Sequence, residues 1–169
     1  MVQIDPAEPG DAAAIESVLR AAFDGGLEAE LASVLREEEA IRTGCSTVAR
    51  EGDVVGYCAV SNADLDGAPA VELAVLGPVG VLPNRQGQGI GTDLVRASLQ
   101  TCKRSGCDAV VLEGDPGYYE RFGFEPASQY GLESDLDPAP GNFLVWPCWP
   151  DALEGVDGVV RHPVPFHAL

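Results

Sequence analysis

The chain has 169 residues, of which 46% are hydrophobic and 22% charged, a composition typical of one globular domain spanning residues 1–169. It carries 27 acidic residues against 10 Lys and Arg, so its formal net charge is −17. Proteins that bind phosphate backbones or anionic membrane surfaces normally present basic patches, so both classes are disfavoured. No apolar run approaches the ~20 residues that a membrane-spanning helix needs.

The cysteines and histidines form no recognisable metal or disulfide pattern. The cysteines are odd in number and include no Cys-x-x-Cys pair, and both histidines lie near the C-terminus, at 162 and 167. This spacing argues against a structural zinc site and a disulfide framework, so we predict no metal and buried thiols. The N-terminus also lacks the basic and apolar segments of a signal peptide, which favours a cytoplasmic protein.

The first half of the chain predicts a short strand, two helices and a hairpin. Residues 2–4 are the candidate strand, and Asp11 is placed to cap a helix whose apolar residues recur at helical spacing up to Gly25. A second helical stripe runs from Leu27 to Leu35. Segments 45–50 and 54–61 are rich in β-branched residues around a turn at 51–53, and 62–69 is expected to be a loop.

The second half alternates strands and helices. A strand is expected over 70–81, bulged at Gly77-Pro78 because proline cannot donate to a ladder. A helix follows from residue 90 to Ser105-Gly106, then a strand at 109–113, a short helix at 118–122 and a strand at 143–146. The last residues are expected to form a tail. The fold class is therefore α/β.

The strongest chemical signal is the glycine-rich entry to the helix at residue 90. Gly87, Gly89 and Gly91 expose main-chain N–H groups at the positive end of the helix dipole, where phosphate groups bind. The alternative is that the glycines only permit a sharp turn. A P-loop is excluded because no lysine precedes Thr92, and a dinucleotide fingerprint is disfavoured because Thr92 stands where its third glycine belongs.

Three motifs resemble those of the GNAT N-acetyltransferases. Gln86-x-x-Gly89-x-Gly91 resembles the family's acyl-CoA signature, Q/R-x-x-G-x-G/A. The run from Gly77 to Pro83 resembles its bulged fourth strand, and Tyr118 to Phe124 resembles its C-terminal FYxKxGF element. The resemblance covers residues 2–126.

This resemblance implies a mixed, mostly antiparallel central sheet, splayed at the fourth strand and flanked by helices. It also implies acetyl-CoA as cosubstrate, without a metal. Pantetheine would pair with the main chain of the fourth strand, and the pyrophosphate would bind the amides of the loop. The implied donor-binding residues are Val79, Gly80, Val81, Gln86, Gly87, Gln88, Gly89, Ile90, Gly91 and Thr92.

The implied reaction is direct acetyl transfer to an amine. Tyr119 matches the family tyrosine that protonates the departing thiolate; its alternative role is aromatic packing. Glu72 is the candidate base, because a carboxylate in an apolar strand is unusual; the alternative is an exposed or paired glutamate. Asp115 would bind substrate or cap the short helix.

The identity of the acceptor stays open between a small molecule and a protein lysine or N-terminus, with an acidic chain suiting a cationic amine. Three further alternatives also stay open. The chain could be a catalytically silent acyl-CoA-binding or partner-docking module, it could use another acyl-CoA, and it could form a homodimer.

Overall fold

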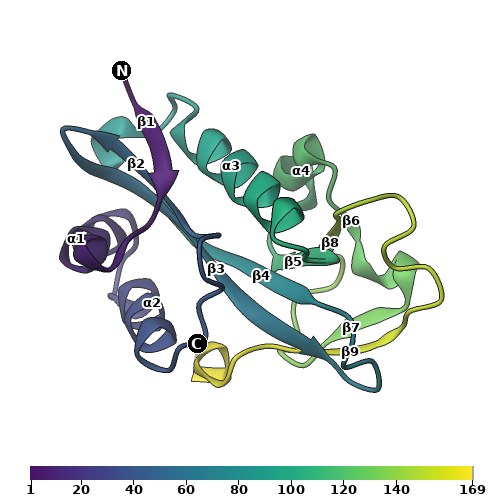
Figure 1. Cartoon of the computed structure of the whole chain (residues 1–169). Coiled ribbons are helices and arrows are strands. Elements are labelled where there is room, and N and C mark those ends of the chain that lie inside the picture. The colour runs from purple at the N-terminus through teal and green to yellow at the C-terminus, as the bar shows by residue number, and fades with distance from the viewer. Residues whose placement is uncertain (169) are drawn as a thin grey trace.

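The computed structural model describes residues 1–168 and contains a nine-stranded sheet flanked by helices (Figure 1). The strand order is β1-β2-β3-β4-β5-β8-β6, with β9 pairing with both β3 and β7. The strands are β1 (Gln3–Pro6), β2 (Thr47–Glu51), β3 (Asp53–Leu65), β4 (Leu73–Val81), β5 (Ala109–Glu113), β6 (Glu125–Pro126), β7 (Leu132–Ser134), β8 (Phe143–Pro147) and β9 (Gly158–Arg161). The helices are α1 (Ala12–Ala22), α2 (Leu27–Glu37), α3 (Ile90–Arg104) and α4 (Pro116–Tyr119), with 3-10 turns η1 (Pro9–Asp11), η2 (Pro83–Arg85), η3 (Glu120–Phe122), η4 (Ala127–Tyr130) and η5 (Val164–Ala168).

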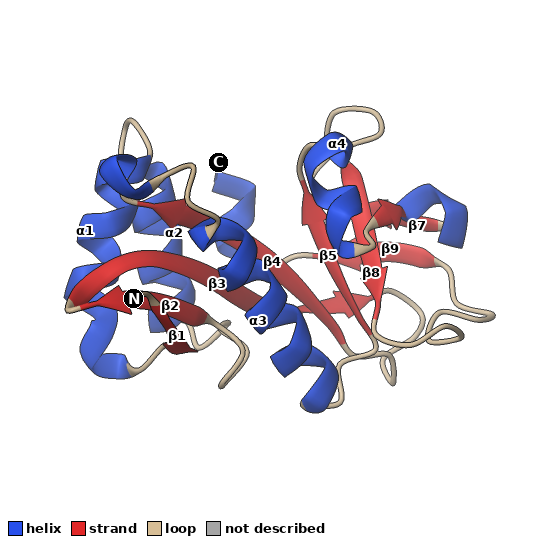
Figure 2. Ribbon diagram, turned by 90° about the horizontal axis from the view of Figure 1, so that it is seen from above, coloured by secondary structure: helices blue, strands red, loops and turns tan. Residues whose placement is uncertain are grey.

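The helices cover opposite faces of the sheet. Helices α1 and α2 lie on one face and α3 on the other (Figures 1 and 2). Successive side chains of β3 point to opposite faces of the sheet. Tyr57 therefore packs with α1 and α2, whereas Cys58 and Val60 pack with α3. No helix within residues 1–168 is long and apolar enough to cross a membrane.

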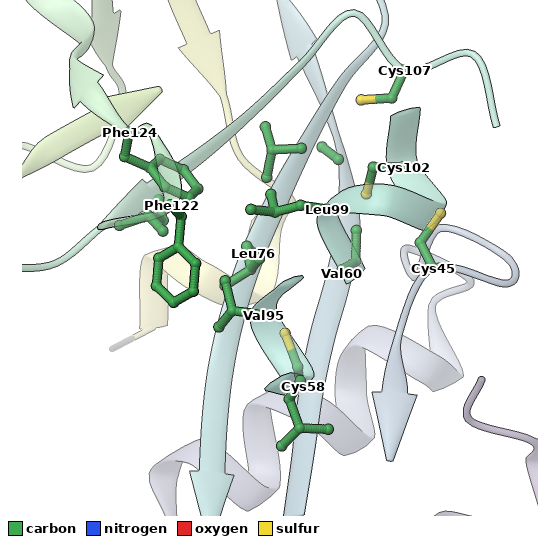
Figure 3. Packing of buried hydrophobic residues seen from close by; sticks show 14 of the residues in the cluster. Cys45, Cys58, Val60, Leu76, Val95, Leu99, Cys102, Cys107, Phe122 and Phe124 are labelled. Carbon is green, nitrogen blue, oxygen red and sulfur yellow. The ribbon is translucent and has the colours of Figure 1, made fainter. Parts of the chain in front are cut away.

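The core beneath α3 also holds the thiols. All five cysteines are free and buried, as the sequence predicts. Figure 3 shows Cys45, Cys102 and Cys107 gathered near the C-terminal end of α3, with Phe122 and Phe124 on the other side of Leu99. Among the described residues, no group of three or more His, Cys, Asp or Glu side chains is arranged to hold a metal ion.

The bulge expected at Gly77-Pro78 is confirmed. On β3 Cys58 pairs with Val79 and Val60 pairs with Leu76, so one residue of β3 faces two residues of β4, Gly77 and Pro78. Strand β4 pairs in parallel with β5 only over Leu73–Val75. Beyond this point β5 and β8 turn away from β4 (Figure 2), which leaves one side of the bulged half of β4 without a strand partner.

Three sequence expectations need correction. The predicted loop at 62–69 is partly strand, because β3 continues to Leu65 and pairs with β4 and β9. Strand β4 begins at Leu73, so Glu72 lies outside it. Asp11 precedes α1, but its carboxylate accepts the main-chain N–H of Glu8 at 2.9 Å instead of capping the helix.

The expected C-terminal tail is structured. Strand β9 pairs in parallel with β7 and antiparallel with the end of β3, which buries Val160 completely. The turn η5 then lies against α2 (Figure 1). A strand this short is stabilised by the neighbours that it pairs with, so its local sequence carries little periodic signal.

Candidate active site

The glycine loop enters α3 with its main chain open to a ligand. Gly89 caps the helix with a left-handed φ of 84°, and Gly87 has a φ of 78°. A Cβ added at either position would meet no atom within 4 Å, so the space beside both residues is empty. The first amides of α3 lack partners one turn earlier in the helix, and they are therefore available to an anion.

A cavity of about 340 Å³ lies against this loop. Its other walls are Val81, Thr92, Tyr118 and the arginines Arg85 and Arg121. The hydroxyls of Thr92 and Tyr118 lie 3.0 Å apart, and the Arg121 guanidinium stacks 4.2 Å from the centre of the Tyr118 ring. From the sequence Tyr118 is expected to pack or to face the substrate, and in the structure it forms a wall of the loop cavity.

Two polar side chains of the loop are engaged within the protein. The Gln86 side-chain amide donates to the Val81 carbonyl at 3.0 Å, which fastens the loop to β4. Arg85 donates to Glu51 at 3.0 Å and to Gln88 at 3.3 Å. The Gln86 side chain therefore helps to hold the loop in place against β4.

The expected donor-binding residues of β4 lie beside the splay. Val79 is half-buried, and Gly80 and Val81 are buried at the end of the strand that leads into the loop. A side chain at Gly80 would collide with the end of α1, because an added Cβ would lie 2.9 Å from Leu19 and 3.1 Å from Phe23. The absence of a Cβ at Gly80 therefore lets α1 pack closely against β4.

Tyr119 lies on the α3 side of the sheet within an aromatic cluster. Its ring meets Tyr118 edge-on at 4.9 Å and Phe124 at 5.7 Å, both between ring centres. Burial raises the pKa of Tyr119 to about 12, because the ionised phenolate is disfavoured away from water. The side chain is therefore a protonated phenol at neutral pH and can act as a proton donor.

Glu72 is not brought to this region. Its side chain is 57% exposed and lies 3.6 Å from Arg42, while its main-chain N–H donates to Asp108 at 2.8 Å. It precedes the first residue of β4, whereas the glycine loop follows the last. This geometry supports the exposed, paired glutamate and gives no support to Glu72 as the base.

A second cavity, of about 840 Å³, opens on the α2 side of the bulge. Its walls are β4 at Val75–Pro78, α2, the end of β5 and the C-terminal segment. Among the described residues no Lys or Arg lines it, whereas five carboxylates do: Glu28, Glu113, Asp115, Asp135 and Asp137. Asp115 also accepts the Gly117 N–H at 2.9 Å and so caps α4. Capping of the short helix is one of the two roles that the sequence predicts for Asp115.

Comparison with known proteins identifies the family. The model of the acetyltransferase (GNAT) family matches residues 12–124. The chain is 35% identical to the Escherichia coli (strain K12) protein named uncharacterized N-acetyltransferase YhbS, over 94% of this chain and 95% of that one. The chain belongs to the GNAT acetyltransferase family.

Solved GNAT structures agree with this fold. The crystal structure of E. coli YhbS in complex with CoA superposes with a TM-score of 0.91 at 35% identity, over 98% of this chain and 91% of that one. A GNAT acetyltransferase from Brucella melitensis in complex with acetyl-CoA gives 0.79 at 35% identity, over 98% of each chain. The expected GNAT fold is therefore confirmed: a mixed, mostly antiparallel sheet flanked by helices.

Beyond the residues matched by the GNAT model, Asp135 binds two histidines in the wall of the larger cavity. Its carboxylate oxygens lie 2.7 Å from His162 Nδ1 and 3.0 Å from His167 Nε2, and it also accepts the main-chain N–H of His162. The side chains of Asp135 and His162 are 6% and 2% exposed, and that of His167 is 43% exposed. In the sequence both histidines lie in the segment that is expected to be a tail, where no motif gives them a role.

Burial and hydrogen bonding set the charges of this cluster. Burial opposes ionisation of Asp135, but the hydrogen bonds from His162 outweigh it and hold the pKa of Asp135 below its ordinary value. Burial lowers the pKa of His162, against the pull of Asp135. At neutral pH the cluster therefore contains an ionised Asp135 and a neutral His162.

Proposed function

We propose that this protein transfers an acetyl group from acetyl-CoA directly to an amine bound in the larger cavity. The observation that carries the proposal is the position of β4. The strand ends at the glycine-loop cavity, and its bulge forms a wall of the larger cavity. A donor that follows β4 from the loop would present its reactive end at the bulge, where an acceptor amine can meet it.

The donor site fits acetyl-CoA. The open amides around Gly87 and Gly89 suit a pyrophosphate, with Arg85 and Arg121 on the rim. The unpaired side of β4 at Val79 and Val81 suits the amides of pantetheine. Two relatives with 35% identity were crystallised with CoA and acetyl-CoA, which supports the same donor here.

Tyr119 supplies the proton for the leaving group. In direct transfer the C–N bond forms as the C–S bond breaks, and the sulfur leaves as a thiolate that a nearby acid can protonate. The Tyr119 phenol stays protonated at neutral pH because burial raises its pKa to about 12. Its ring lies beside Gly114, which also lines the acceptor cavity.

The acceptor is a cationic amine, such as a polyamine or a lysine-like side chain. The five carboxylates of the cavity create a negative field that concentrates cations. Glu28 gives this preference a specific anchor, because its Oε1 atom is buried without a hydrogen-bond partner in a wall of the cavity. A buried carboxylate oxygen is costly unless it is paired, and an ammonium group would satisfy it.

The decisive test is CoA release, followed with a thiol reagent, across a panel of cationic and neutral amines. We expect turnover with cationic amines and a raised KM for them in Glu28→Gln. Acetyl-CoA should be used better than succinyl-CoA, since a succinyl carboxylate would face the same negative field. Tight binding of acetyl-CoA without release to any amine would instead establish a silent binding module.

A further inference from the structure

We propose that His167 is the base that takes a proton from the acceptor ammonium, with Asp135 as the residue that orients it and His162 as the anchor of Asp135. This inference rests on the proposed function and adds a catalytic residue to it. It is carried by geometry: one ionised carboxylate holds two imidazoles in the wall of the acceptor cavity.

The hydrogen bonds decide which nitrogen can accept a proton. A carboxylate is only an acceptor, so His167 Nε2, which lies 3.0 Å from Asp135 Oδ2, must be the donor. With the hydrogen on Nε2, the lone pair of the imidazole is on Nδ1, which can accept a proton. The same argument makes His162 Nδ1 a donor to Asp135 Oδ1 at 2.7 Å.

Exposure separates the roles of the two histidines. The His162 side chain is 2% exposed and packs against Phe143 and Phe166, with ring centres 5.9 and 5.8 Å away, so an acceptor amine cannot reach it freely. The His167 side chain is 43% exposed and lines the cavity. It can therefore both meet the amine and return the proton to water.

The surroundings of His167 are acidic. The charged groups that line the cavity with His167 are Glu28 from α2, Glu113 and Asp115 around the end of β5, and Asp135 and Asp137 after β7. All are carboxylates, and His162 is held neutral by burial. A cationic amine would therefore be attracted to the part of the cavity that His167 lines.

The other ionisable groups are less suited to this step. Carboxylates have ordinary pKa values of about 4 and are weak bases towards an ammonium group. Tyr119 acts as the acid, and Glu72 lies outside the cavity, paired with Arg42. Of the two histidines that line the cavity, His167 is the exposed one, and Asp135 holds it in place.

The proposed reaction is balanced in protons and electrons. The ammonium gives one proton to His167 Nδ1, and the amine lone pair attacks the thioester carbon. The C–N bond forms, the C–S bond breaks, and the thiolate takes the Tyr119 proton. The nitrogen then loses its second proton, which restores the Tyr119 phenol through solvent, and His167 releases its own proton to water. The products are the N-acetylated amine, CoA as a thiol and one proton.

The experiment is the pH profile of kcat/KM for the amine, in wild type and in His167→Gln, at saturating acetyl-CoA. We expect kcat/KM of wild type to rise with pH along an ascending limb that depends on the imidazole of His167. In His167→Gln this limb should disappear, and kcat/KM at pH 7 should fall by about 10²–10⁴-fold. Activity should recover above about pH 9, as the amine loses its own proton. Added imidazole should partly restore the rate of His167→Ala.

Matched variants separate a catalytic from a structural role. Asp135→Asn should shift the ascending limb, whereas Glu133→Gln removes an exposed carboxylate of β7 that lies outside the acceptor cavity and should keep the limb. Titration calorimetry with acetyl-CoA should give unchanged affinity in all variants, since none lies in the glycine-loop cavity. A variant that binds acetyl-CoA in calorimetry and melts at the wild-type temperature is folded.

Two results would overturn the inference. If His167→Gln keeps its ascending limb and more than half of the wild-type kcat/KM, His167 is not the base, and the acetyltransferase function stands. If wild type binds acetyl-CoA but releases CoA to no amine, the proposed function fails, and the role of His167 fails with it.

Discussion

Gly114 and Tyr119 occupy complementary space. A Cβ added at Gly114 would lie 2.6 Å from Cε2 of the Tyr119 ring, closer than a packed carbon can approach. Gly114 follows β5 and lines the acid-rich cavity, while Tyr119 packs on the α3 side of the sheet. A single glycine backbone therefore separates the proposed proton donor from the proposed acceptor cavity.

This contact predicts that Gly114→Ala will impair transfer without impairing donor binding. The new methyl group must displace the Tyr119 ring, and small displacements of a catalytic group are costly to the rate. We expect kcat to fall by at least about tenfold, with the Kd for acetyl-CoA unchanged because Gly114 is not part of the loop cavity. Wild-type kcat in Gly114→Ala would show that the position of the Tyr119 ring is unimportant for turnover.

Tyr119→Phe removes one hydroxyl and keeps the aromatic packing. Turnover should fall by about 10²–10⁴-fold while acetyl-CoA binding persists, since the lost interaction forms mainly in the transition state. The pKa of about 12 sets the pH dependence: the wild-type advantage should persist through neutral and mildly alkaline pH and shrink only as the phenol ionises near pH 12. Steady-state kinetics with a working acceptor at several pH values would measure it. Retention of more than half of the wild-type kcat at neutral pH would assign the proton to another group or to water.

Tyr118→Phe is the matched control for this experiment. It removes the hydroxyl that lies 3.0 Å from Thr92 at the loop cavity, while Tyr119 stays intact. Its effect should appear in the affinity for acetyl-CoA more than in kcat. A larger loss of kcat in Tyr118→Phe than in Tyr119→Phe would mean that Tyr118, and not Tyr119, donates the proton to the thiolate.

Gly89→Val should weaken acetyl-CoA binding more than tenfold, equivalent to about 1.4 kcal/mol or more. The side chain would project into the empty space beside the loop and force valine into a left-handed φ of 84°. Gly67→Val provides the control, because Gly67 has a φ of 79° and similarly open surroundings but lies outside the loop cavity. Calorimetric titration of the two folded variants separates backbone strain from ligand crowding. Equal affinities would contradict the assigned donor site.

Asp11 should make stability depend on acid pH. The hydrogen bond from Arg50, at 2.7 Å, lowers the pKa of Asp11 below its ordinary 3.8, against the effect of burial. A carboxyl whose pKa is lower in the folded protein stabilises it above the unfolded-state pKa, and this stabilisation is lost as pH falls through the folded-state pKa.

Asp11→Asn should therefore reduce the free energy of unfolding at pH 7 by about 1 kcal/mol, allowing for solvent screening of a partly exposed pair. The difference from wild type should shrink as pH falls below 3.8 and vanish once Asp11 is protonated in both states. Urea unfolding at several pH values measures it, with Asp24→Asn as an exposed carboxylate control. A difference that stays constant down to the lowest pH would show that the charge of Asp11 is not its source.

Local sequence was sufficient to predict the region around the glycine loop, which is the proposed donor site. Helix α3, the glycine loop and the bulge at Gly77-Pro78 follow from side-chain spacing, from glycine and from the missing N–H of proline. These properties act within a few residues of one another, so they can be read without knowing the fold. The motifs around the loop and Tyr119 resembled GNAT motifs for the same reason.

Only the tertiary structure decided which side chains lie near the proposed acceptor. The predicted strand at 70–81 began too early and so included Glu72, whereas β4 begins at Leu73. The partners that surround Glu72, Arg42 and Asp108, come from distant parts of the chain.

The same reason explains why His162 and His167 were missed. Their segment is short and rich in proline, so its sequence carries no helical or strand period. It becomes ordered because β9 pairs with β3 and β7 and because η5 packs on α2, and these contacts bring both histidines to Asp135. Short motifs were enough to show the resemblance to the family and to indicate the proposed donor loop, whereas long-range strand pairing determined which side chains line the proposed acceptor cavity.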